Sequence, residues 1–247
     1  MQELERSTLT VLGVAACAAT APQFPDSTHW WAKVVRDGLE LRATGGLLVT
    51  APAGRLTRVA VGAALLAARL AMAVAGARPH TTLLPDPRRP ALLAVLRPGG
   101  AAEPNRDERV LHRALVCPEP LAPGRPVGPA LPLLRRAADA ERAWLRTVTD
   151  RADRNRLLAV LGREEEDSDP EAVLIVLGSH SGPAGEIRAG QALRRVLLTA
   201  QALGLHGDIV AGPVDLSGVR AREVPGAGIG LLPQVVLEVR PFTRPAA

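Results

Sequence analysis

The sequence predicts an α+β protein in which two similar α/β halves are fused in one chain. Residues 61–77 and 189–205 each carry Gly-x-Ala-Leu near their start and a second glycine fourteen residues after the first. A repeat this far apart indicates two similar units that pack about one core. Strand-like segments alternate with long helical ones, as in the α/β and α+β classes. The proline- and glycine-rich residues 98–105 divide the chain into a first half, residues 1–104, and a second half, residues 105–247.

The composition indicates a folded chain whose core is made of small aliphatic side chains. Of the 247 residues, 47% are hydrophobic, and nearly all of these are Ala, Leu and Val. That content is too high for a disordered chain, and the length is sufficient to bury a core. Aromatic residues make up only 2%, so the chain has few rings on which nucleic-acid bases stack.

The positive charge does not predict nucleic-acid binding. The formal net charge is +5 and the isoelectric point is about 10.6. The basic residues are almost all arginines, scattered singly or in pairs among acidic residues, whereas nucleic-acid-binding proteins gather them in a patch or stripe. We therefore expect no nucleic-acid partner. The pairs are Arg88-Arg89, Arg135-Arg136 and Arg194-Arg195.

Cysteine usage and the N-terminus are those of a cytoplasmic protein. Cys17 and Cys117 are too few for a disulfide framework, and two reduced core thiols are favoured over a single bridge between them. The opening MQELERSTLT carries acidic residues where a signal peptide needs positive charge. Residues 59–77 are the candidate membrane span, but Arg69 interrupts it at a cost of about 3 kcal/mol. A buried helix of a soluble fold is the better interpretation, and we expect no membrane partner.

In the first half, helices are expected at residues 7–20 and 54–75, with Gly76 as the C-cap of the second. A β-hairpin is expected at residues 33–42, where Asp37-Gly38 supplies the turn. Three further short apolar runs complete this half, and the last two are expected to be strands: residues 45–52, 81–84 and 92–96.

In the second half, the most strand-like run of the chain is residues 172–177. It leads through a glycine-bearing loop, residues 178–185, into the second copy of the repeated helix. The amphipathic pattern of residues 133–148 predicts one long helix. Two more helices and two more strands are expected: helices at residues 107–115 and 153–162, and strands at residues 208–210 and 235–239.

No local motif assigns a chemistry. Residues 177–183 lie between a strand and a helix, where phosphate sites and nucleophiles occur, but they match neither the P-loop nor the nucleophile elbow. They are best interpreted as a connection, in which His180 is the histidine to mutate. The glycine-rich residues 226–230 lack the strand and helix of a dinucleotide site. The five histidines show no metal-ligand spacing, and no acid–base pair or catalytic triad is local in the sequence.

Over nearly its whole length the chain resembles the Acg branch of the FMN-binding nitroreductase superfamily. In the first half the resemblance is carried by Ala21-Pro22, Trp30, Gly54-Arg55 and residues 62–65, 69–71, 76, 84–87, 90 and 93–94. In the second half it is carried by residues 189–193, 197–200, 204–205 and 233–234. Members of this branch look like two nitroreductase halves in one chain. The resemblance therefore implies a nitroreductase-like fold arranged as a pseudodimer, which accounts for the repeat. The two repeated segments would be its central helices, and their small residues, Gly62 and Gly190 among them, would allow close packing.

The resemblance also implies a flavoprotein. Bacterial relatives of this kind are dimers that bind FMN at the subunit interface and use NAD(P)H to reduce nitro groups or quinones. For this chain the resemblance implies FMN as the cofactor, NAD(P)H as the electron donor, a small-molecule ligand, and either a monomeric pseudodimer or a homodimer. The positions that it implies in cofactor binding are Ser27 and Trp30 in the first loop and Gly190 in the second copy of the helix.

Two departures from the family pattern fall on the flavin site. The family loop Ala-Pro-Ser-x-His-Asn-x-Gln-Pro-Trp reads APQFPDSTHW at residues 21–30. The arginine-rich Arg-Arg-Thr-x-Arg segment, a natural phosphate clamp, is replaced by LVCPEP at residues 115–120, where Glu119 would repel a phosphate. The candidates to replace that clamp are nearby arginines: Arg109, Arg113 and Arg125.

Two functions of different class follow. One is an FMN-dependent oxidoreductase with a remodelled site, in which hydride passes from NAD(P)H to the flavin and then to a nitro- or quinone-type acceptor. The other is a non-catalytic protein that keeps the fold for ligand or flavin sequestration or for partner binding. The loss of flavin-site motifs favours the non-catalytic protein, and the resemblance favours the oxidoreductase.

Overall fold

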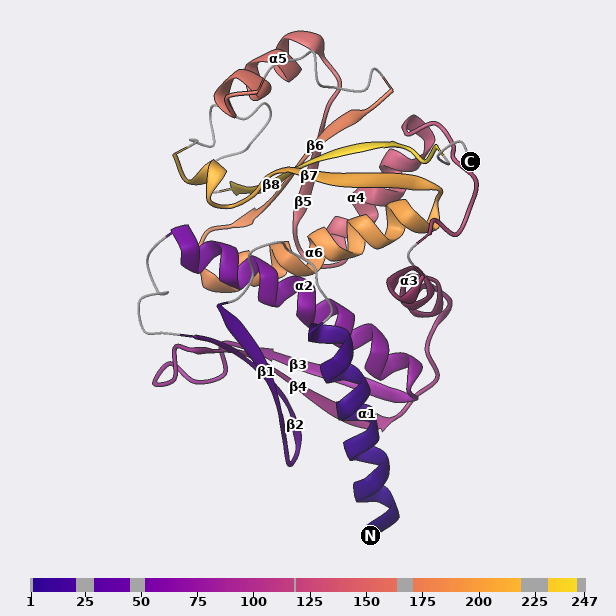
Figure 1. Ribbon diagram of the computed structural model, residues 1–247. Coiled ribbons are helices and arrows are strands. Elements are labelled where there is room, and N and C mark those ends of the chain that lie inside the picture. Colours follow the sequence, from indigo (N-terminus) through magenta and orange to yellow (C-terminus); the bar gives the residue numbers. More distant parts are fainter. Residues whose placement is uncertain are drawn as a thin grey trace.

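Two four-stranded sheets enclose a central pair of helices in the computed structural model (Figure 1). The structure describes residues 2–20, 29–44, 52–117, 119–163, 171–218 and 231–243. Its N-terminal elements are α1 (Gln2–Thr20), β1 (Trp30–Val35), β2 (Gly38–Ala43), α2 (Pro52–Val74), β3 (Ala77–Leu83) and β4 (Leu92–Ala101). The later elements are α3 (Arg106–Val116), η2 (Gly128–Ala130), α4 (Leu131–Asp139), β5 (Trp144–Val148), α5 (Arg151–Val160), β6 (Val173–His180), α6 (Pro183–Ala202), β7 (Leu205–Ala211), η4 (Asp215–Gly218) and β8 (Leu231–Pro241).

The two sheets have matching topologies. The first has the strand order β1-β2-β4-β3 and the second the order β5-β6-β8-β7. All six strand pairings are antiparallel. In each sheet the second strand is followed by a long central helix, α2 after β2 and α6 after β6. The helix before the first strand of each sheet, α1 or α4, lies beside that central helix (Figure 1).

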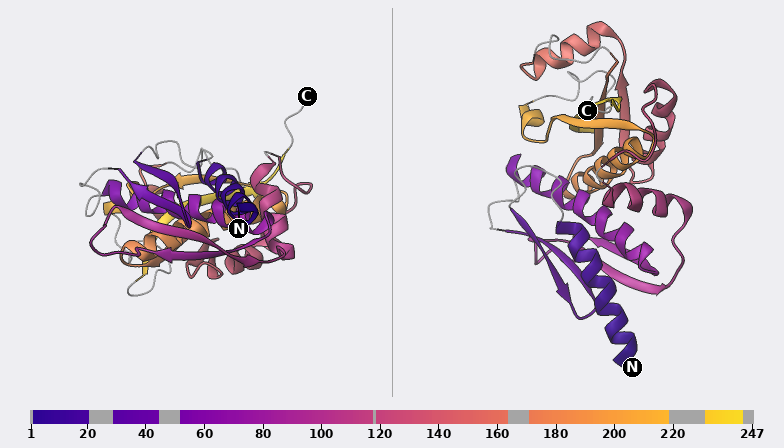
Figure 2. Two further views of the ribbon diagram at one scale, coloured as in Figure 1. Left: turned by 90° about the horizontal axis from the view of Figure 1, so that it is seen from below. Right: turned by 45° about the vertical axis from the view of Figure 1, so that its right-hand side comes forward.

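Helices fill the space between the sheets. Figure 1 shows α1 and α2 against the inner face of the first sheet, and α4 and α6 against the inner face of the second. In addition, α5 packs on the outer face of the second sheet. The N-terminal end of α1 projects beyond this body (Figure 2). Because helices from both halves of the chain lie between the sheets, residues of the two halves meet in this central helical layer.

The number of sheet faces that helices cover explains the hydrophobic pattern of the strands. In β2, Leu39 and Leu41 are fully buried against α1 and α2, while Glu40 between them points to the uncovered face. In β6, Ile175 packs against α4 and α6, and Leu174 packs beneath α5. A strand covered on both faces reads as a continuous apolar run, and a strand covered on one face alternates. This difference made residues 172–177 the clearest strand in the sequence.

The α2–α6 contact is closed by two glycines, one from each helix. Gly62 and Gly190 lie back to back, so that a Cβ built on Gly62 would stand 2.9 Å from the Cα of Gly190 and would overlap the Ile187 carbonyl oxygen. A Cβ on Gly190 would overlap the Val59 carbonyl oxygen in the same way. The prediction that the two copies of the repeated helix pack together is therefore confirmed. Gly76, expected as a C-cap, has a left-handed φ of 86°.

The central position of α2 also accounts for its apolar composition. Over Gly54–Val74 this helix is long and apolar enough to cross a membrane, and 89% of its most apolar window is buried inside the molecule. That burial is expected of a core helix, which passes the same length and composition test.

Most of the expected elements are confirmed, with ends that differ by a few residues. The hairpin forms with its turn at Arg36-Asp37, and α1 begins earlier than expected, at Gln2. The helices expected at residues 54–75, 107–115 and 153–162 correspond to α2, α3 and α5, and the strands expected at residues 81–84, 92–96, 172–177, 208–210 and 235–239 correspond to β3, β4, β6, β7 and β8.

The long helix expected at residues 133–148 is wrong in its second half. The helix ends at Asp139, Arg142 takes a left-handed φ of 59°, and β5 begins at Trp144. The turn carries Glu141 into the interior, where it binds two arginines that are distant in the sequence. The local amphipathic pattern contains no information on these ion pairs with distant residues. In the structure the ion pairs outweigh the local preference for a helix.

Three smaller expectations are also corrected. β4 continues through the proline- and glycine-rich run to Ala101, because its end pairs with Ala77 of β3. β6 likewise includes Gly178–His180 of the expected loop. Cys17 is exposed rather than a core thiol, and neither Cys17 nor Cys117 forms a disulfide. Residues 45–51 of the apolar run expected at residues 45–52 lie outside the described residues. The glycine-rich residues 226–230 lie outside them as well.

A complete capping box at the start of α3 gives a first test of the structure. The Asn105 side chain accepts from the Glu108 backbone N–H at 2.9 Å, and the Glu108 carboxylate accepts from the Asn105 N–H at 2.7 Å. We expect Asn105→Ala to lower the free energy of unfolding by about 1 kcal/mol, because a helix donor loses its acceptor. Urea denaturation followed by circular dichroism measures this loss. An unchanged midpoint and slope would mean that α3 does not begin at this cap.

Candidate functional site

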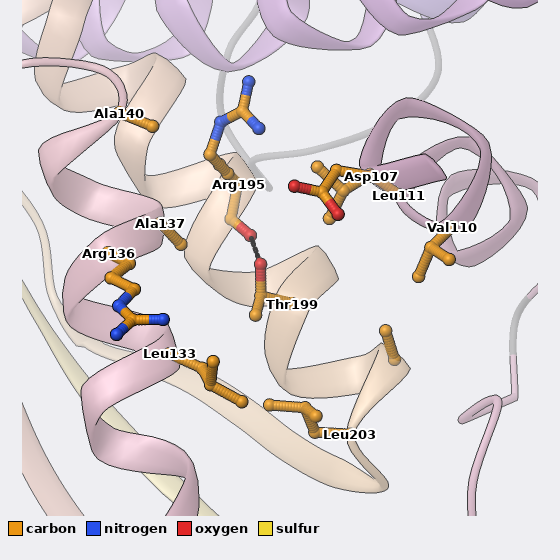
Figure 3. Close-up of a pocket in the computed structure, with 11 residues that line it drawn as sticks. Asp107, Val110, Leu111, Leu133, Arg136, Ala137, Ala140, Arg195, Thr199 and Leu203 are labelled. Carbon is orange, nitrogen blue, oxygen red and sulfur yellow. Dashed lines mark hydrogen bonds between the residues drawn. The ribbon is translucent and has the colours of Figure 1, made fainter. Parts of the chain in front are cut away.

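A pocket of about 420 Å³ opens between α3, α4 and α6 (Figure 3). Its volume lies in the range of roughly 300–1,000 Å³ typical of small-molecule sites. The wall is mostly apolar, and its members come from all three helices: Asp107, Val110 and Leu111; Leu133, Arg136, Ala137 and Ala140; Arg195, Thr199, Ala202 and Leu203. Val110 and Leu133 are about two-fifths exposed, so the pocket presents apolar surface that a ligand would cover.

One edge of the pocket is fixed by a buried ion cluster, which we call the Glu141 cluster: Arg69, Glu141, Gln191 and Arg195. The Arg195 guanidinium donates to Glu141 Oε1 from Nε at 2.9 Å and lies 2.7 Å from it at Nη2. Arg69 Nη1 donates to Glu141 Oε2 and to Gln191 Oε1, both at 2.8 Å. The Glu141 side chain is only 5% exposed. The cluster therefore joins α2, α6 and the turn after α4.

The Glu141 cluster carries an excess positive charge. Arg69 and Arg195 share the single carboxylate of Glu141, which leaves one charge without a counter-ion in the cluster. Charges taken out of water are stabilised by opposite charge within a few ångströms. Because Arg195 also lines the pocket, that excess is available to an anion bound there.

Two further charged side chains line the pocket from different helices. Figure 3 shows the Arg136 guanidinium on α4 and the Asp107 carboxylate at the start of α3. Within the described part of the chain, neither the Arg136 side chain nor the Asp107 side chain makes a hydrogen bond or an ion pair. The Thr199 hydroxyl donates to the Arg195 carbonyl at 2.8 Å, which leaves its oxygen as an acceptor. The arrangement suits an amphipathic ligand with an anionic end.

The residues predicted from the sequence to bind a cofactor do not line this pocket. Ser27 lies outside the described residues. Trp30 begins β1 and packs against the core of the first sheet, and its indole N–H is enclosed without an acceptor among the described residues. Gly190 is in the helix–helix contact with Gly62. Their cofactor roles stay predictions.

The three candidate arginines do not meet at one place either. The Arg109 side chain is exposed and donates to the Pro104 carbonyl at 2.6 Å, and Arg113 is exposed on the same helix. Arg125 lines a separate pocket of about 560 Å³ together with Glu171 and Phe242. A phosphate clamp made of all three is therefore not assembled in the structure, although each of them separately stays a candidate.

Sequence reasoning missed the arginines that do line the pocket. Arg136 and Arg195 are the second members of two arginine pairs in the sequence. Adjacent helical residues point about 100° apart, so only one member of each pair faces the pocket. A helical-wheel comparison would have shown that the two members of each pair point in different directions. The sequence contains no local sign that α3, α4 and α6 lie beside one another.

No cation-binding group is evident in the described ranges. Among these residues, no three side chains of His, Cys, Asp and Glu are grouped to hold a metal ion. His180, at the end of β6, is exposed.

Comparisons with known proteins return structures of nitroreductase type. No protein-family model matches the chain, and no curated protein matches it. Similar solved structures include nitroreductase A from Vibrio parahaemolyticus, with 14% identity over 56% of this chain and 70% of that one at a TM-score of 0.42. NfrA2 from B. megaterium has 14% identity, covers 56% and 68%, and has a TM-score of 0.44. The NADPH:FMN oxidoreductase from Vibrio harveyi has 15% identity, covers 56% and 71%, and has a TM-score of 0.42. At such identities and scores, function has to be argued from the chain's own residues.

Proposed function

We propose that the protein is a nitroreductase-like, FMN-binding oxidoreductase with a remodelled flavin site in the pocket between α3, α4 and α6. The observation that carries this proposal is a mostly apolar pocket lined by Arg195 and by Arg136, whose side chain has no hydrogen-bond or ion-pair partner among the described residues. A flavin mononucleotide needs the same combination, since a ribityl chain joins its charged phosphate to a flat ring system with a large apolar face. The sequence resemblance supplies FMN as the first ligand to test.

We further propose that the chain is a pseudodimer of residues 1–104 and 105–247. Support comes from the shared strand order of the two sheets and from the glycine contact between α2 and α6. The residues that line the pocket belong to the second half, and the first half would contribute indirectly, because Arg69 of α2 holds the pocket-lining Arg195 through Glu141. Whether two such chains also associate as a homodimer is measured by light scattering.

The described residues fit an FMN molecule in two respects. Arg136 and Arg195 would hold its phosphate, because guanidinium groups pair with phosphate oxygens through charge-assisted hydrogen bonds. Val110, Leu133 and Leu203 would cover its ring and exclude water. When bound, the flavin would supply hydride transfer between NAD(P)H and a nitro- or quinone-type acceptor. The chain itself contributes position and positive charge, and the Glu141 cluster fixes Arg195 before the ligand arrives.

Replacement of Arg136 tests the pocket directly. We expect Arg136→Ala to weaken FMN binding about tenfold or more, because a charge-assisted hydrogen bond contributes roughly 1.5–3 kcal/mol. Quenching of flavin fluorescence measures the affinity. Riboflavin, which lacks the phosphate, should bind both proteins equally. Arg135→Ala is the matched control, since its exposed side chain lies outside the pocket lining.

Two outcomes would overturn the assignment of the pocket. If neither FMN nor riboflavin binds the wild-type protein, the flavin proposal is wrong. If FMN binds and only Arg109→Ala, Arg113→Ala or Arg125→Ala abolishes binding, the phosphate lies elsewhere.

A second function, ligand sequestration without catalysis, is favoured by one observation. The predicted arginine candidates do not assemble into a phosphate clamp. A protein of this kind would retain flavin and yet fail to oxidise NADH or NADPH with quinone or nitroaromatic acceptors. Steady-state assays of the flavin-loaded protein separate the two functions, and turnover above that of free FMN would exclude sequestration as the only role.

A further inference from the structure

The charge of the α3–α4–α6 pocket depends on a residue that does not line it. Arg69 lies on α2, in the first half of the chain, whereas the residues of the pocket wall belong to the second half. Arg69 Nη1 donates to Glu141 Oε2 at 2.8 Å, and Arg195 Nη2 lies 2.7 Å from the other carboxylate oxygen, Oε1. The Glu141 side chain is only 5% exposed. One enclosed carboxylate is therefore divided between two arginines, one from each half.

The described residues provide no other counter-charge for these two arginines. Both form ion pairs with Glu141 alone. The remaining partner of Arg69 is Gln191, a buried neutral amide whose Oε1 accepts from Nη1 at 2.8 Å. The Glu141 cluster therefore carries one net positive charge, which would disappear if Arg69 were neutral.

The other charged groups on the pocket wall cancel each other. They are the Asp107 carboxylate and the Arg136 guanidinium. The net positive charge at the pocket is therefore that of the Glu141 cluster, which reaches the wall through Arg195. Charges act on one another through space, and more strongly where protein replaces water.

Glu141 and Arg69 have different effects on Arg195. A carboxylate that paired with Arg195 alone would hold the guanidinium in place and also cancel its charge. Because Arg69 pairs with the second oxygen of Glu141, the carboxylate holds Arg195 while a positive charge remains for a ligand. Replacement of Glu141 cannot separate these effects, since it removes the fixed position together with the counter-charge.

We propose that Arg69 gives the pocket its preference for anionic ligands from the other half of the chain. It acts through Glu141 and Arg195, as a positioning residue and not as a ligand contact. The ligand class that follows is an amphipathic anion, in which one anionic group is joined to an apolar ring system. The inference rests on the proposed function in that both place a ligand in this pocket, and it extends to anions other than FMN.

A matched pair of fluorescent probes measures this preference without flavin. Anilinonaphthalene sulfonate is an aromatic anion, and phenylnaphthylamine is the same ring system without the sulfonate. Titration of the full chain at constant ionic strength gives both affinities, and their ratio is the anion preference. A change that only loosens the pocket alters both affinities, so the ratio reports the charge.

Two variants remove the net charge by different routes. Arg69→Gln deletes the guanidinium and keeps an amide that can donate to Glu141. Gln191→Glu keeps the guanidinium and places a carboxylate at the position that accepts from it at 2.8 Å. Arg69→Lys retains the charge in a different shape. Arg78→Gln is the matched control, since it removes an exposed arginine of β3 in the first half.

The wild-type protein should bind anilinonaphthalene sulfonate more tightly than phenylnaphthylamine. Arg69→Gln and Gln191→Glu should each lower that ratio about threefold to tenfold, the effect of one unit charge in a partly screened site. The loss stays in this range because the Arg69 side chain is 28% exposed. Arg69→Lys and Arg78→Gln should keep the wild-type ratio. Arg136→Ala should lower it, which locates the probe in the pocket.

Three results would overturn the inference: equal affinities of the wild-type protein for both probes, an unchanged ratio in Gln191→Glu, or a loss in Arg69→Lys as large as in Arg69→Gln. Thermal unfolding shows which variants are folded, and Gln191→Glu decides if Arg69→Gln is not. If FMN fails to bind while the ratios change as expected, the flavin proposal is wrong and this inference stands. If FMN binds and the ratios do not change, the inference is wrong and the flavin proposal stands.

Discussion

Gly190→Leu is expected to destabilise the protein by roughly 3 kcal/mol or more, and to leave much of it unfolded at 37 °C. A Cβ at this position would overlap the Val59 carbonyl oxygen and stand 2.9 Å from the Cα of Gly62. Backbone atoms cannot move aside as a flexible side chain can, so α2 and α6 would have to separate. Overpacking of a core typically costs about 1–3 kcal/mol and more where the backbone is blocked, which is a large part of a typical stability of about 5–15 kcal/mol.

Gly13→Leu is the matched control for that prediction. Gly13 also lies within a helix, α1, but a Cβ there would meet nothing within 4 Å. Leucine favours helix over glycine by up to about 1 kcal/mol, so this variant should be as stable as wild type or slightly more stable. Urea denaturation measures both free energies. Equal stabilities for Gly13→Leu and Gly190→Leu would show that the helices do not cross at the glycines.

Glu141→Gln is expected to lower the free energy of unfolding by about 3–5 kcal/mol. This change removes the carboxylate that Arg69 and Arg195 share, and it leaves two guanidiniums close together and partly buried. Removal of one partner from a buried ion pair costs this much because the remaining charge is not compensated. The same variant should weaken any ligand held by Arg195, whose guanidinium loses its fixed position.

Asp37→Asn serves as the comparison for the loss of Glu141. Asp37 pairs with Arg97 at 2.9 Å, but both side chains are about half exposed or more. Exposed pairs of this kind contribute little to stability because water screens their charges, so we expect a far smaller loss than for Glu141→Gln. Arg97, through a hydrogen bond and its charge, holds the pKa of Asp37 below its ordinary value, and solvent limits the effect on stability. A loss of less than about 1 kcal/mol for Glu141→Gln would mean that the carboxylate does not compensate both arginines.

The elements that were predicted correctly depend on local chemistry. The hairpin at β1 and β2 follows from alternation and a turn, and the end of α2 follows from Gly76. The helix predicted over residues 133–148 failed because Glu141 must leave the helix to reach Arg69 and Arg195. No sequence window that contains Glu141 also contains either of its partners, so a local pattern gives no sign of the turn.

The candidate site was harder to predict than the fold for the same reason. Arg136 and Arg195 were visible as members of arginine pairs, yet the sequence gives no hint that α4 and α6 bring them to one pocket. The family pattern directed attention to the segment before α4, where the arginines are dispersed. The repeated glycines, by contrast, predicted a contact between two distant helices because a small residue recurs at the same place in each copy.

The glycine contact has a consequence for the way in which the chain is made. α2 leaves the ribosome more than a hundred residues before α6, and at about 5–20 residues per second this interval is on the order of ten seconds. During that time an apolar helix long enough to span a bilayer lacks the partner that covers its glycine face. In the folded protein Arg55 and Arg58 pair with Glu186 of α6, and Arg69 pairs with Glu141 of the turn after α4. Before those partners are made, the three arginines disfavour entry of α2 into a bilayer, because a charged side chain within the membrane is costly.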